Sequence, residues 1–144
     1  ENDLLSLIDF GTSSVTLAII VVLMIRHIAR SRIVTPTIIL SSVNGYLLLG
    51  LLGAVLLSIA DAVHVLLSGG QGSGILLPRQ GSPEFSDYLY LAFITLTTVG
   101  YGDVTAASDL TRSVAILIGL AGPLYMTILI AMLVGKFLAD RDAK

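Results

Sequence analysis

The 144-residue chain contains no cysteine, and only 12% of its residues are charged. The absence of cysteine excludes disulfides, thiolate zinc sites and cysteine nucleophiles. A net charge of −2 provides no strongly basic surface of the kind that binds nucleic acid. The two histidines, His27 and His64, lie far apart and lack a metal-ligand spacing. A hydrophobic content of 55% and a mean hydropathy of +0.94 instead indicate a membrane protein.

Three apolar runs, residues 12–28, 36–67 and 110–139, are candidates for membrane-spanning helices. A helix needs about 20 residues to cross a bilayer, so the first run must borrow from its flanks while the other two are long enough. No basic start precedes an apolar run, so we expect no signal peptide. Because the chain begins at Glu1 without methionine, we expect it to be part of a longer protein.

A basic cluster follows the first apolar run: Arg26, His27, Arg30 and Arg32. One interpretation is a voltage sensor, which carries arginine at every third position through an apolar helix. These residues are instead gathered at the helix end, as in a cytoplasmic loop that obeys the positive-inside rule. We favour the second interpretation and expect residues 136–144, which are also rich in charge, on the same cytoplasmic side.

A glycine-rich loop at 68–82 separates the second apolar run from a short helical pattern at 83–97. Ser82 offers an N-cap, Pro83 suits the first helical position, and Glu84 places an acid in the first turn. This helix is too short to span a bilayer. We expect it to dip into the membrane and to point its partly negative C-terminal end toward the centre.

Directly after this helix the chain reads TTVGYGD, from Thr97 to Asp103. Successive carbonyls face the same side only if right- and left-handed backbone conformations alternate, and glycine adopts the left-handed one without a Cβ penalty. Glycine occupies alternate positions here, Gly100 and Gly102, and Thr98 adds a hydroxyl at the inner end. The pattern predicts a ladder of oxygens that replaces water around a monovalent cation.

The motif TVGYG is that of potassium selectivity filters, and the chain from Pro36 onward resembles the tetrameric potassium channel family. The resemblance implies an outer helix at 36–67, a turret at 68–82, a pore helix at 83–97, a filter at 98–102 and an inner helix at 110–139. Residues 35–144 would form the pore domain, and 1–34 an extra transmembrane helix with its cytoplasmic link. We therefore expect an all-α membrane protein with three transmembrane helices and a re-entrant pore helix.

The family's filter implies a role for each residue of the motif. Thr98, Val99, Gly100 and Tyr101 would give the oxygens that hold K+, the transported ion, and Gly102 would complete the outer mouth. The side chains of Val99 and Tyr101 would turn away and pack behind the filter. One chain supplies one ladder, so we expect three identical subunits to join it in a homotetramer within the lipid bilayer.

The residues expected to support the filter depart from two family patterns. Tyr90 and Leu91 stand where many members carry a tryptophan pair, and Ile94 stands where some carry a glutamate that shares a proton with the motif's aspartate. We predict that the Tyr90 hydroxyl donates to the Asp103 carboxylate. The alternative is that Tyr90 only anchors the helix at the membrane interface.

Two threonines complete the expected filter support. Thr95 is predicted to meet the Tyr101 hydroxyl, and Thr97 directly precedes the filter. In the last apolar run, Gly119, Gly122 and Pro123 form a candidate gating hinge, because proline breaks the helical hydrogen-bond ladder. Gly122 falls where many family members carry a hinge glycine. A static kink without motion is the alternative.

The sequence thus predicts a potassium-selective channel and not an enzyme, placed in the plasma membrane with filter mouth and turret outside and the C-terminus in the cytoplasm. A non-selective cation channel on the same scaffold is one alternative, although Tyr101 argues against it. A potassium uptake transporter is another, but such proteins repeat the pore loop within one chain, and this chain has one. A membrane sensor with a vestigial pore is the last. The sequence carries no recognisable signature of a gating stimulus, and we expect any regulatory domain to lie beyond this sequence.

Overall fold

The computed structural model describes residues 36–70 and 72–142, together with isolated positions between 12 and 26, and side chains up to residue 135. Most of the first predicted span, 12–28, lies outside the described residues, and so does the basic cluster except for Arg26. The expectation of three transmembrane helices is therefore tested only for the second and third runs.

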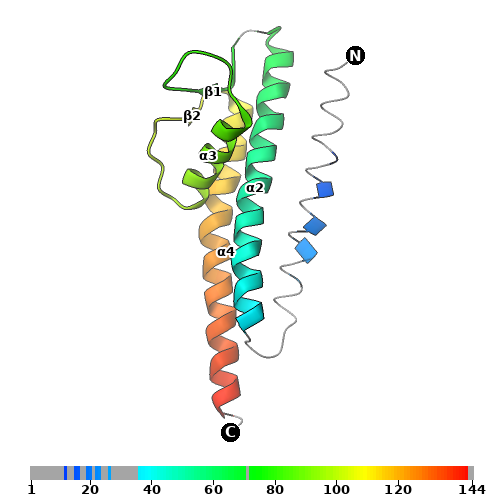
Figure 1. The fold of residues 1–144 in the computed structure, drawn as a ribbon, viewed down its shortest axis with the longest axis vertical. Coiled ribbons are helices and arrows are strands. Elements are labelled where there is room, and N and C mark those ends of the chain that lie inside the picture. Colours follow the sequence, from blue (N-terminus) through cyan, green and yellow to red (C-terminus); the bar gives the residue numbers. More distant parts are fainter. Residues whose placement is uncertain are drawn as a thin grey trace.

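Two long helices lie side by side and antiparallel, α2 over Pro36–Leu67 and α4 over Asp109–Asp142 (Figure 1). Both contain an apolar stretch that is long enough to cross a membrane. The helix α2 covers the residues over which the sequence predicts the outer helix, and α4 begins one residue before the predicted inner helix and ends three residues after it. The helix α4 is assigned without a break through Pro123.

The short helix α3 spans Phe85–Leu96 and packs against both long helices at one end of the pair (Figure 1). Its N-cap is Glu84 and not Ser82, which corrects the prediction from the sequence. The reason is a capping box, in which the Glu84 backbone N–H donates to Asp87 at 2.7 Å and the Glu84 side chain accepts from the first turn. Arg79 of the preceding loop adds an ion pair to Asp87 at 2.6 Å.

Two short strands join the loops on either side of α3. The strand β1, Ile75–Leu76, pairs antiparallel with β2, Thr105–Ala106, so that Ile75 lies opposite Ala106. One strand lies in the segment predicted as the turret, and the other follows the filter motif. The ladder therefore ties the loop before α3 to the chain that leaves the filter.

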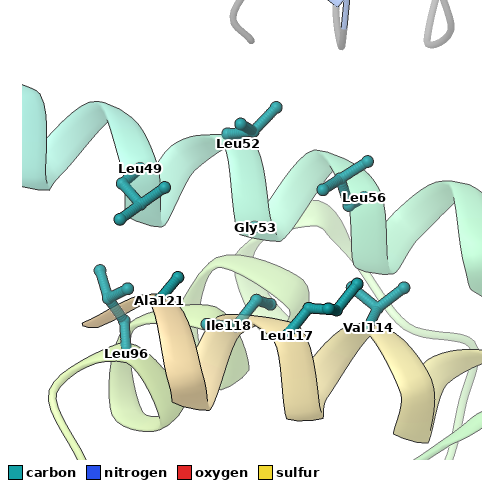
Figure 2. A pocket seen from close by; sticks show the side chains of 9 residues that line it. All are labelled: Leu49, Leu52, Gly53, Leu56, Leu96, Val114, Leu117, Ile118 and Ala121. Atoms are coloured by element: carbon teal, nitrogen blue, oxygen red, sulfur yellow. The ribbon is translucent and has the colours of Figure 1, made fainter. Parts of the chain in front are cut away.

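The main core lies where α3 meets the two long helices. Its buried members are Ala54, Leu57, Ile75, Tyr88, Leu91, Ala92, Ile94, Leu96, Val104 and Ile118. Next to it, α2 and α4 leave a cavity of about 100 Å³, lined by apolar side chains of both helices and closed at one end by Leu96 (Figure 2). A hard cation requires oxygen ligands, so this cavity is not the place where an ion would bind.

Candidate functional site

The TVGYG segment forms a turn of alternating backbone hand between α3 and β2. Positive φ angles occur at Thr98 (61°), Gly100 (55°) and Gly102 (80°), whereas Val99 and Tyr101 between them are not in this region. The alternation predicted for Gly100 and Gly102 is present. Thr98 is a third left-handed residue that the sequence did not predict, because a β-branched side chain disfavours this conformation.

The inner half of the filter is held by the end of α3. The Thr98 N–H donates to the Thr95 carbonyl at 3.1 Å, and the Gly100 N–H donates to the Ile94 carbonyl at 3.0 Å. These bonds bend the chain back along the helix and hold Thr98 in its strained conformation. The amide hydrogens of Thr98 and Gly100 are therefore bonded to carbonyls of α3.

The hydroxyls of the two threonines that precede the filter point back into α3. Thr97 donates to the Phe93 carbonyl at 2.6 Å, and Thr95 donates to the Leu91 carbonyl at 2.7 Å. Among the described residues of one chain, the hydroxyl of Thr95 bonds to its own helix, and the predicted contact with the Tyr101 hydroxyl is not formed. The Tyr101 side chain is 73% exposed and points away from its own core.

The outer end of the filter is held by the predicted bond between Tyr90 and Asp103. The Tyr90 hydroxyl donates to Asp103 Oδ2 at 2.7 Å, and Asp103 Oδ1 accepts from the Val104 N–H at 3.0 Å. This hydrogen bond lowers the pKa of Asp103 and raises that of Tyr90, because it stabilises the charged carboxylate and the neutral phenol. The prediction of this contact is confirmed, and its effect on conduction is taken up below.

The motif is almost uncovered in the single chain. Residues 97–103 are all exposed, and the side chain of Val99 is 51% exposed. The Val99 and Tyr101 side chains, expected to pack behind the filter, are thus only partly covered by the described residues of their own chain. If these residues form a filter, other chains would have to cover the exposed Val99 and Tyr101 side chains.

The carbonyl of Leu96, at the end of α3, is a meeting point of three helices that the sequence did not predict. It accepts from the Tyr46 hydroxyl of α2 at 3.1 Å. Gly122 of α4 packs on the same group so closely that a Cβ at this position would overlap the Leu96 oxygen and lie 2.9 Å from its carbonyl carbon. The candidate hinge residue therefore has a packing role, whichever part it plays in motion.

A second tyrosine connects the two long helices beside this point. The rings of Tyr46 and Tyr125 lie 5.7 Å apart, and the Tyr125 hydroxyl donates to the Ser42 carbonyl of α2 at 2.7 Å. The signal in the sequence that could have indicated these contacts is the presence of isolated tyrosines in apolar helices, since the hydroxyl of a buried tyrosine needs a hydrogen-bond partner. The partners themselves are backbone carbonyls, which carry no mark in a sequence.

These features can be set beside known families. A family model described as an ion channel matches residues 46–139. The chain belongs to this ion channel family. The match extends from Tyr46 in α2 through α3 and the filter motif into α4, and it supports a pore domain of the potassium-channel type. Searches of curated proteins and of solved structures found no match to this channel.

Proposed function

We propose that this membrane protein conducts K+ selectively through a ring of four TVGYG segments, one from each subunit of a homotetramer. The observation that carries the proposal is the alternation of left-handed φ angles at Thr98, Gly100 and Gly102 within that motif. Such a backbone turns successive carbonyls to one side, where they replace the hydration shell of the ion. Thr98, Val99, Gly100 and Tyr101 provide these oxygens, and Gly102 shapes the outer mouth.

The exposure of the motif supports the assembly of several copies. Cyclic symmetry is the common way to close a ring of identical subunits, and neighbouring chains would cover the exposed Val99 and Tyr101 side chains. The same neighbours would offer the Tyr101 hydroxyl a partner that the described residues of its own chain do not provide. The turret and Asp103 face outward in this arrangement, and the ends of α2 and α4 distant from the filter face the cytoplasm.

The direct test is ion flux through purified protein in liposomes. We expect a tetramer that passes K+ at least about tenfold faster than Na+, which corresponds to a difference of about 1.4 kcal/mol in barrier height. Protein-free liposomes made with the same lipids are the control. Equal K+ and Na+ flux would favour the non-selective channel, and a tetramer that passes neither ion would favour the vestigial pore.

A second prediction concerns the bond between Tyr90 and Asp103. We propose that it stabilises the conducting form of the filter, because it ties the residue after Gly102 to the pore helix. Tyr90→Phe is expected to shorten open times in single-channel recordings by a few fold without preventing assembly. Tyr125→Phe, which removes a hydroxyl bonded far from the filter mouth, is the matched control.

The pH dependence of this bond has a definite sign. The pKa of Asp103 is lowered from 3.8 by the Tyr90 hydroxyl, so the stabilisation is complete above pH 3.8 and is lost as the pH falls through the lowered pKa. Strong acidification of the outer solution should therefore shorten open times in the original channel and have little further effect on Tyr90→Phe. Equal acid sensitivity of the two proteins would contradict the assignment.

A further inference from the structure

Asp61 is the one buried acidic side chain in the part of the chain whose side chains are described, with 4% of its surface exposed. It lies near the end of α2, and donors from two other segments surround its carboxylate. The Ser73 hydroxyl donates at 3.0 Å, and the Gly74 N–H and the Tyr88 hydroxyl of α3 donate as well. Burial of a charge is costly unless such bonds compensate it, and here several donors surround the buried carboxylate and hold it in one position.

Gly74 connects the Asp61 carboxylate to the chain that leaves the filter. Its carbonyl accepts from the Ala107 N–H at 2.7 Å and from the Thr111 hydroxyl at 2.6 Å. A Cβ on Gly74 would lie 2.5 Å from the Ser108 hydroxyl and 3.1 Å from Asp61 Oδ1, so glycine is required by space. One residue thus joins the buried carboxylate on one side to the start of α4 on the other.

The same segment is linked to the filter mouth by the strand ladder. The strand β2 begins three residues after Gly102 and pairs with β1, which begins directly after Gly74. Tyr88 connects the other side of the carboxylate to α3, whose C-terminal end holds the inner half of the filter. Asp61 is therefore connected both to α3, which precedes the filter, and to the strand ladder, which follows it. The distance between these two elements determines how far the filter segment must reach.

We propose that Asp61 is a positioning residue of the conduction site. Its carboxylate binds Tyr88 of α3 and Gly74, Gly74 in turn binds the chain that leaves the filter, and this connection keeps the filter in its conducting shape. The inference rests on the proposed function and adds a residue that does not touch the ion. A carboxylate is suited to the place because it only accepts hydrogen bonds and has about four acceptor positions. Asparagine has nearly the same shape but would turn an NH2 group toward surrounding donors.

The test is Asp61→Asn, recorded as single channels in planar bilayers with symmetrical K+. We expect the mean open time to fall by about tenfold, because one strong acceptor is replaced by a donor. The K+/Na+ selectivity of the open channel should not change, since the carbonyls themselves are unaltered. Asp109→Asn, an exposed acid at the start of α4, is the matched control and should keep the original open time.

Two further measurements separate positioning from a general loss of stability. Raising external K+ should lengthen the open time of Asp61→Asn, because ions bound in the conducting filter stabilise that form by mass action. A folding defect would instead lower the number of channels and leave the open time insensitive to K+. Tyr88→Phe should also shorten the open time, and the double variant should be no worse than Asp61→Asn, because both changes break one network.

The outcomes are distinct. If the original channel passes no K+, the proposed function fails and this inference fails with it. If the original channel conducts and Asp61→Asn keeps its open time, only this inference is overturned. Should Asp61→Asn not assemble, Tyr88→Phe decides alone, and an unchanged open time in that milder variant overturns the inference.

Discussion

Replacing Gly102 with alanine is expected to abolish K+-selective conduction. Gly102 has a φ of 80°, where an L-residue with a Cβ is disfavoured by about 1–2 kcal/mol. In the proposed tetramer the same cost would arise four times, or about 4–8 kcal/mol in total. We expect the backbone at the filter mouth to leave the left-handed region and to turn its carbonyls out of register.

The structure makes this test clean because space around Gly102 does not contribute. A Cβ at this position would meet no heavy atom of its own chain within 4 Å, so conformational preference and not crowding within the chain is what alanine changes. Gly135→Ala is the matched control, because that glycine lies within the helix α4 and its Cβ would also meet nothing. Liposome flux of K+ and Na+ measures the effect, and unchanged K+ selectivity in Gly102→Ala would refute the filter assignment.

The second large effect is expected at Gly122 of α4. Alanine there would place its Cβ against the backbone carbonyl of Leu96, and a helix end cannot retreat as a flexible side chain does. Overpacking of this kind costs about 1–3 kcal/mol or more, which exceeds the roughly 1 kcal/mol that alanine gains over glycine in a helix. We expect Gly122→Ala to lower the thermal stability of the protein and to displace α4 from α3.

Gly119 offers a matched control one turn away on the same helix. A Cβ there would lie 3.6 Å from Thr95 Cγ2, which is ordinary contact, so Gly119→Ala should be neutral or stabilising by up to about 1 kcal/mol. Thermal unfolding of the two variants in detergent compares them directly. If Gly122→Ala keeps its stability and changes only gating, Gly122 acts as a hinge and the close contact is not limiting.

Several features followed from the sequence because they depend on residues close together in the chain. The two long apolar helices are set by composition, and the hand of the backbone at Gly100 and Gly102 is set by the absence of a Cβ. The bond between Tyr90 and Asp103 was also predicted, because the resemblance to potassium channels places Tyr90 at a tryptophan position and leaves its phenol as the partner for Asp103. The capping box at Glu84 is local too, yet Ser82 and Pro83 offered a competing start that sequence rules favoured.

Other features were decided only when distant segments packed together. The Leu96 carbonyl meets Tyr46 and Gly122 because α2 and α4 close on the end of α3 from two sides, and a backbone carbonyl leaves no trace in the sequence. Asp61 lies near the end of a long apolar helix, and only the folded chain shows that the loop after α2 lies over it and supplies donors to its buried carboxylate. The sequence determined the alternating backbone of the TVGYG segment, since the positions of its glycines are a property of consecutive residues. The tertiary structure decided what holds the filter in place, because hydrogen-bond partners far apart in the chain are chosen by packing.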